Sequence, residues 1–119
     1  MCESKSRITR HTVTVPWQHI PSPCSRMKWA FIYTLDEPAT KPRFDTIGSL
    51  TCVGVPGVSD APGLARQLVE DGVELIELCG GFGGAGLAAV VSAVQGRVPV
   101  GAVFFGVDAS SGLSRIFSK

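Results

Sequence analysis

The stretch at residues 73–86 constrains the fold of this chain more than any other. A short apolar segment at 73–78 leads to Cys79 and then to a turn in which five of the seven residues 80–86 are glycine. The pattern predicts a buried strand, a tight turn and a helix that begins near Gly86. In parallel α/β sheets, ligands commonly bind at such a junction, outside the carboxyl end of a strand and in front of a helix N-terminus.

Strand and helix patterns alternate along the chain from residue 27. The expected strands lie at 29–33, 51–55, 73–78 and 98–105, and the expected helices lie at 59–71, at 85–95 and after 108–111. The connection at 35–50 contains two prolines and a glycine, so we expect no helix there. We predict a small three-layer α/β domain in the order β-β-α-β-α-β-α, with a mostly parallel sheet flanked by helices.

The first 26 residues differ in character from the rest. They contain both histidines and three prolines, and the prolines leave room for no more than a short edge strand at 12–15. We expect residues 1–26 to be an N-terminal extension outside the core. Residues 27–119 are expected to form a single α/β domain.

The composition argues against two classes of partner. The net charge is +1, whereas nucleic-acid-binding proteins usually carry a basic patch. The longest apolar run, at 82–94, has 13 residues and is interrupted by glycines, whereas a membrane-spanning helix needs about 20. We therefore expect a protein that binds neither nucleic acid nor a membrane.

The four cysteines, Cys2, Cys24, Cys52 and Cys79, lack the spacing of a metal site. The sequence has no C-x-x-C pair, and no histidine lies near Cys52 or Cys79, so we expect no bound metal. The first 26 residues also lack the apolar segment of a secretion signal. We expect a cytoplasmic protein whose thiols are free.

Three segments of the chain resemble a family of small bacterial proteins of unknown function. They are Met-Lys-Trp-Ala-Phe-Ile-Tyr at 27–33, Glu-Leu-Cys-Gly-Gly-Phe-Gly at 77–83 and Arg-Val-Pro-Val-Gly-Ala-Val at 97–103. The resemblance covers about residues 27–117 and implies that the core begins at Met27. The family brings no established activity, so the chemistry of the glycine turn must be argued from the residues themselves.

The glycine turn has three interpretations. Residues 81–86 match G-x-G-x-x-G, and Asp108 follows 22 residues later, which is the form of a dinucleotide-binding pattern. Only 11 residues follow Asp108, too few for the further strands of such a fold, so we expect no NAD or FAD cofactor. The turn could instead bind a smaller anion through its backbone N–H groups, or serve only tight turning and close packing. Its candidate ligand-binding residues are Gly80, Gly81, Phe82 and Gly83.

Cys79 is a candidate catalytic and ligand-binding residue. A thiol at the end of a strand and just before a helix N-terminus can form a reactive thiolate. Cysteine catalysis usually also needs a nearby base, and both histidines of the chain lie in the N-terminal extension. The alternative is a buried, inert thiol.

Glu77 is the second catalytic candidate. Because side chains alternate along a strand, it shares a face with Leu75 and Cys79, and we expect this face to point into the core. A buried carboxylate needs a partner or lines a cavity, where it can act as a general acid or base. Asp45, in the long connection, is a candidate to join it. The alternative is a structural role, with backbone N–H groups of the turn or a basic side chain as partner. The candidate basic partners are Lys28, Arg43, Arg66 and Arg97.

The helix expected at 85–95 is apolar around nearly its whole circumference, unlike a one-sided surface helix. A small core cannot cover it on every side, so we expect its outer side, which includes Val91, to contact another copy of the chain. We interpret the chain as a homo-oligomeric domain that binds a small ligand, with an anion as one candidate, at residues 77–86. The alternatives are a non-catalytic structural or interaction protein and an enzyme that uses Glu77 or Cys79.

Overall fold

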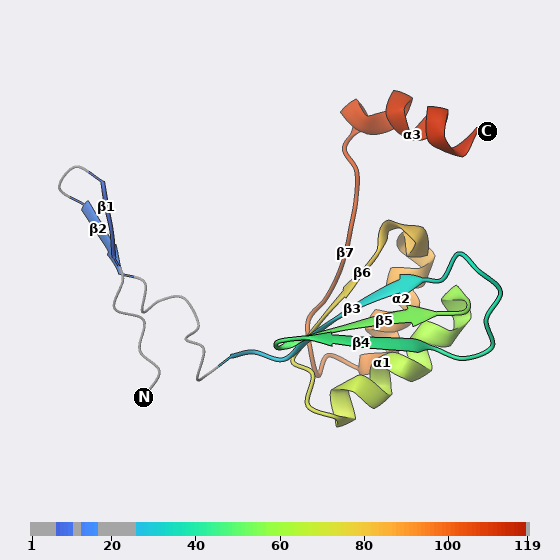
Figure 1. Cartoon of the computed structure of the whole chain (residues 1–119), viewed down its shortest axis with the longest axis horizontal. Coiled ribbons are helices and arrows are strands. Elements are labelled where there is room, and N and C mark those ends of the chain that lie inside the picture. The colour runs from blue at the N-terminus through green and yellow to red at the C-terminus, as the bar shows by residue number, and fades with distance from the viewer. Residues whose placement is uncertain (1–6, 11–12, 17–25, 119) are drawn as a thin grey trace.

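The computed structural model describes residues 7–10, 13–16 and 26–118 (Figure 1). Near the N-terminus, β1 (Arg7–Arg10) and β2 (Val13–Pro16) pair antiparallel in a two-stranded sheet of their own. The strand expected at 12–15 overlaps β2, and Thr12 lies outside the described residues. All other described elements follow Arg26.

The main domain is a five-stranded sheet with two helices packed on it (Figure 1). Its strands are β3 (Trp29–Thr34), β4 (Arg43–Ile47), β5 (Leu50–Val55), β6 (Leu75–Leu78) and β7 (Val100–Ala102). The two packed helices are α1 (Ala61–Glu70) and α2 (Gly83–Val94), and a third helix, α3 (Ser110–Phe117), follows β7. The strand order is β4-β5-β3-β6-β7. Only β4 is antiparallel to its neighbour. The prediction of an α/β domain with a mostly parallel sheet is confirmed.

The connection at 35–50, in which we expected no helix, contains an additional strand, β4. It forms a hairpin with β5 through the two residues Gly48 and Ser49. Gly48 has φ +59, a conformation that glycine adopts readily and that a tight hairpin turn requires at its first central position. Every residue of β4 is exposed, so this edge strand lacks the apolar run that marks the inner strands.

The core lies between one face of the sheet and the two helices α1 and α2. Fully buried residues alternate along the strands, for example Ala30 and Ile32 on β3 and Ile76 and Leu78 on β6. Both crossovers, from β5 to β6 and from β6 to β7, run in the same direction across the sheet. Right-handed crossovers that advance in one direction place their helices on the same face, and Figure 1 shows α1 and α2 together behind the sheet.

The opposite face of the sheet is not covered by a helix of the described chain, in contrast to the expected three layers. We call this surface the open face. It carries the half-buried aromatic residues Trp29, Phe31 and Tyr33 of β3. The third helix, α3, stands away from the sheet (Figure 1), and none of its residues is buried. The arrangement is thus two layers, because the helix that could form the third layer does not pack on the domain.

The last strand is shorter than the expected 98–105. Val103 N–H donates to Leu78 O at 3.0 Å, one residue beyond the end of β7. After this bond the chain leaves the sheet, and Phe104 and Phe105 are exposed. Among the described residues, no helix is long and apolar enough to cross a membrane.

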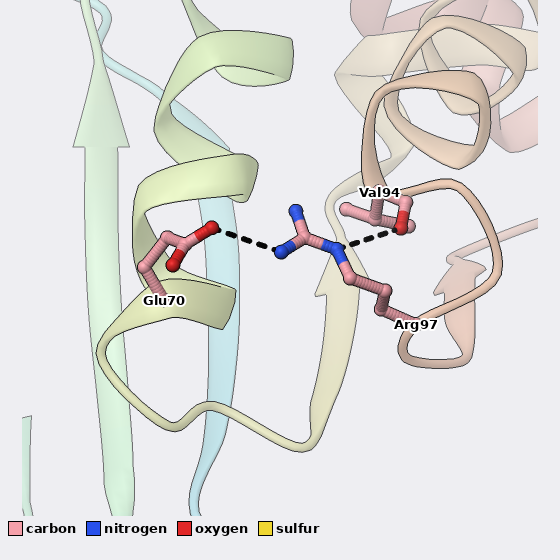
Figure 2. Close-up of polar contacts among 3 residues, drawn as sticks. All are labelled: Glu70, Val94 and Arg97. Carbon is pink, nitrogen blue, oxygen red and sulfur yellow. Dashed lines mark hydrogen bonds and ion pairs between the residues drawn. The ribbon is translucent and has the colours of Figure 1, made fainter.

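A polar clamp joins the ends of the two packed helices (Figure 2). The Arg97 guanidinium donates to Glu70 Oε1 of α1 at 3.0 Å and to Val94 O of α2 at 3.3 Å. Helix α2 ends beside this clamp, and the two residues that follow it, Gln95 and Gly96, have positive φ. Both charged side chains are substantially exposed, so we expect the ion pair to contribute no more than about 1 kcal/mol.

The buried core residues that the structure describes begin at Ala30, which leads to a prediction about the N-terminal segment. A chain that starts at Met27 is expected to keep its free energy of unfolding within about 0.5 kcal/mol, as is usual for changes away from the core. Urea unfolding of both chains measures this. A chain that starts at Ile32, and so lacks half of central β3, is the control and should not fold. A large loss of stability in the Met27 chain would show that residues 1–26 belong to the core or to an interface.

Candidate functional site

The glycine turn lies at the carboxyl edge of the sheet, where the parallel strands end. It comprises Cys79, the short 3-10 helix η4 (Gly80–Phe82) and the start of α2. Cys79 N–H donates to Ile32 O of β3 at 2.9 Å, and Phe82 N–H donates to Cys79 O at 3.2 Å. The turn is therefore fixed against the end of the central strand, as the sequence pattern predicts.

Three segments of the chain meet at this turn. A β-carbon placed on Gly81 would lie 3.2 Å from Thr34 Oγ1, at the end of β3, and 3.5 Å from Cys79 Sγ. A β-carbon on Gly80 would lie 3.4 Å from the Phe105 ring, which follows β7. The missing side chains at 80 and 81 thus allow a hydroxyl, a thiol and an aromatic ring to converge on one backbone segment.

The glycines of the turn have different roles. Gly86 permits packing, since a β-carbon there would lie 2.9 Å from Phe82 Cβ. Gly83 is required by its conformation, with φ +65. Gly84 has neither constraint, because its φ is not positive and a β-carbon there would meet no atom within 4 Å. The chain's own packing therefore does not account for glycine at position 84.

The structure buries the side chain of Phe82 and exposes that of Glu77. The Phe82 side chain is buried in the core, so only its backbone can face a ligand at the turn. Glu77 is exposed and lies on the open face, opposite Ile76 and Leu78. The expectation of a core-facing carboxylate is corrected, because the sheet face that Glu77 shares with Leu75 and Cys79 is the one without helices.

The structure does not bring Asp45 to Glu77. The pairing of neighbouring strands places them in one row across the open face, in the order Asp45, Cys52, Phe31, Glu77 and Gly101. Three strand spacings separate the two carboxylates, which is about 14 Å at 4.8 Å per strand. They are too far apart to share one proton or one small reacting group.

Two of the four basic residues that were candidate partners of Glu77 make other ion pairs in the described part of the chain. Arg97 pairs with Glu70, and Arg43 lies 3.8 Å from Glu37 and 3.7 Å from Asp45. The Lys28 backbone N–H donates to Glu74 Oε2 at 3.0 Å. An exposed carboxylate such as Glu77 needs no buried partner, because water solvates it.

Cys52 and Cys79 are both free and half-buried. Cys2, Cys24 and the two histidines lie outside the described residues, so no histidine stands beside Cys79 in the described part of the structure. That part also contains no group of three or more histidine, cysteine, aspartate or glutamate residues that could hold a metal ion. The thiol of Cys79 has the hydroxyl of Thr34 as its polar neighbour across Gly81.

A cavity at the opposite, amino edge of the sheet was not expected from the sequence. It has a volume of about 470 Å³, and its lining residues are Arg26, Lys28, Thr46, Gly48, Ser49, Thr51, Asp71 and Val73. The lining contains two cationic side chains and three hydroxyl groups but only one carboxylate, that of Asp71. Its lining comes from the β4–β5 hairpin and from the segments before β3 and after α1, so no contiguous sequence signal could have identified it.

The outer side of α2 is apolar and exposed, as the sequence predicts. Val91 is 46% exposed, and the neighbouring exposed residues are alanines at 85, 88 and 89. The buried side of the helix consists of Gly86, Val90 and Val94.

A model of a protein family of unknown function, DUF6506, matches residues 27–118. The chain belongs to this family. The match begins at Met27 and includes the glycine turn, the open face and α3. No curated protein and no solved structure matched the chain. The resemblance noted in the sequence is confirmed, and membership of DUF6506 brings no activity with it.

Proposed function

We propose that this member of DUF6506 binds a small ligand at the carboxyl edge of its sheet and acts as a homo-oligomer. The observation that carries the ligand site is Gly84. Glycine occupies a helix start where neither φ nor packing requires it, and open space at such a position fits the close approach of a ligand to the backbone.

The surrounding groups suggest what the ligand presents. The N–H groups at the start of α2 point out of the helix N-terminus, where an anionic or carbonyl oxygen is favoured. The Thr34 hydroxyl and the Cys79 thiol flank Gly81 on the same turn, and Glu77 and Phe31 lie beside each other on the open face. A small molecule with one anionic or carbonyl group and an apolar part fits this set.

The oligomeric part of the proposal is supported by two separate exposed apolar surfaces, either of which is a candidate contact. One includes Val91 on α2, and the other includes Ile116 and Phe117 on α3. Extended apolar patches are uncommon on monomeric proteins. A clean monomer mass in light scattering at micromolar concentration would contradict it. The free thiols of Cys52 and Cys79 are consistent with the further proposal of a reducing bacterial cytoplasm as the place of action. A disulfide at either residue in protein isolated from its host would contradict that location.

Sulfate or phosphate is expected to stabilise the chain more than chloride at matched ionic strength. An anion at ten times its dissociation constant adds about 1.4 kcal/mol by linkage, which corresponds to about 6–11 °C in melting temperature for a domain of this size. Thermal unfolding in the two salts measures the difference, and the same assay with a metabolite collection extends the search to other ligands.

The variant that tests the location is Gly84→Val, because a β-carbon at this position would meet no protein atom within 4 Å. It is expected to remove the increment while leaving the stability in chloride unchanged. Gly63→Val, the same change in the first turn of α1, is the matched control and should keep the increment. An increment that survives Gly84→Val would move the anion site elsewhere, with the amino-edge cavity of Arg26 and Lys28 as the next location.

A further inference from the structure

The open face carries an apolar area that no helix in the described part of the chain covers (Figure 1). Phe31 and Tyr33 on β3 stack with ring centroids 6.4 Å apart. Trp29 at the start of the same strand pairs with Leu50 and Leu75 of the two neighbouring strands, so these side chains form an apolar row beside the aromatic pair. Sheets of parallel strands are normally covered on both faces.

The same chain contains an apolar segment that is largely exposed. Residues 103–117, which we call the C-terminal arm, include Phe104, Phe105 and Phe117 with exposed fractions of 68%, 60% and 81%. On α3, Leu113, Ile116 and Phe117 recur at helical spacing and form one apolar side. An amphipathic helix of eight residues is not stable alone in water, so α3 requires a surface to pack against.

The start of the arm directs it away from its own sheet. Val103 extends the ladder by one bond to Leu78, and the Phe105 ring packs over Gly80 at the carboxyl edge. The chain then passes through the 3-10 helix η5 (Val107–Ala109) directly into α3. The arm therefore leaves the domain beyond the edge of the sheet, and Figure 1 shows α3 separated from the strands.

We propose that two copies of the chain exchange their C-terminal arms, so that α3 of each copy covers the open face of the other. This inference rests on the homo-oligomer part of the proposed function and names the surface and the partner. An eight-residue helix is about 12 Å long, which spans two to three strands at 4.8 Å each. The apolar side of α3 thus matches the width of the apolar row that Leu50, Trp29 and Leu75 form across β5, β3 and β6.

The buried area reaches the size of a specific dimer interface. A buried aromatic side chain accounts for about 150–250 Å², so burying the exposed parts of Phe104 and Phe117 of one arm would remove about 220–370 Å² from water. With a similar area on the sheet beneath them, and with both arms related by two-fold symmetry, the total is about 900–1,500 Å². This range overlaps that of a standard specific interface, about 1,200–2,000 Å².

Light scattering on the full chain and on two charge variants tests the exchange. The wild type is expected at twice the chain mass of 12.5 kDa. Ile116→Glu combined with Phe117→Glu should halve that mass. Val91→Glu, on the outer side of α2, should leave it at two chains. A dimer that dissociates only with Val91→Glu would overturn the arm exchange and keep the homo-oligomer, whereas a wild-type monomer would overturn both.

Cross-linking distinguishes exchange from an arm that folds back on its own sheet. Cys52 lies on the open face beside Phe31, and Ile116→Cys places a thiol on the apolar side of α3. In a background with Cys2, Cys24 and Cys79 replaced by serine, a flexible bis-maleimide should join these thiols between chains and give a covalent dimer. Ser111→Cys, on the opposite side of α3, is the control and should give at least tenfold less covalent dimer. An internally bridged monomer, or no bridge with Ile116→Cys, would overturn the proposal.

Discussion

Replacing Ile76 with alanine is expected to lower the free energy of unfolding by about 2–5 kcal/mol. Ile76 is 0% exposed and lies on β6 between two parallel neighbours, with its side chain under the two helices. The loss combines the transfer of the removed methyl groups with the cavity they leave in a rigid core. Because whole domains are stable by only about 5–15 kcal/mol, the variant should unfold at a much lower urea concentration.

Glu77→Ala, at the next residue of the same strand, is the matched control. The Glu77 side chain is exposed on the open face, so its removal is expected to change the stability by no more than about 0.5 kcal/mol. Urea unfolding monitored by tryptophan fluorescence measures both variants. A loss of several kcal/mol with Glu77→Ala would show that this carboxylate is buried and paired, and would contradict its exposure on β6.

The sequence was sufficient to predict the inner strands and the two packed helices. Their signals are local: an apolar run at 73–78 bounded by glycine turns, and helical spacing of apolar residues in α1. The edge strand β4 carries no such signal, because all its residues are exposed and its stability comes from pairing with β5. Such an edge strand can be predicted only when the strand that it pairs with in the hairpin is known.

The number of layers could not be derived in the same way. Trp29, Phe31 and Tyr33 have the character of a strand buried on both faces, and the sequence led us to expect a cover of helices there. The structure places α1 and α2 on the other face. A sequence shows that a surface is apolar, but not whether a helix of the same chain or of another copy covers it.

The position of the glycine turn could be predicted along the chain, but the arrangement of the candidate residues across the sheet could not. The turn at 79–84 lies at the carboxyl edge because that position follows from a strand that precedes a helix. We expected Asp45 to lie near Glu77, but the sequence does not give the strand order. In the structure, β5 and β3 lie between the strands that carry these two residues. The amino-edge cavity combines separate segments of the chain, which only the folded structure brings together.

Gly86→Val is expected to destabilise the domain by about 1–3 kcal/mol, the usual cost of overpacking. A β-carbon at this position would lie 2.9 Å from Phe82 Cβ and 3.3 Å from Val58 Cγ1. Phe82 is buried in the core, and its Cβ is held by the backbone of η4, so it cannot move aside as the end of a flexible side chain could. Valine gains only a few tenths of a kcal/mol over glycine in helix propensity, which does not offset the clash.

Gly84→Val makes the same chemical change two residues earlier in the same helix, where an added β-carbon would meet no atom within 4 Å. Its stability is expected to stay within about 0.5 kcal/mol of the wild type. The pair separates the two roles of glycine in this turn, because only position 86 is explained by packing. Thermal and urea unfolding of both variants without ligand measure the difference. Equal losses at the two positions would mean that Gly84 is also required by the fold, and its openness would then no longer support a ligand site.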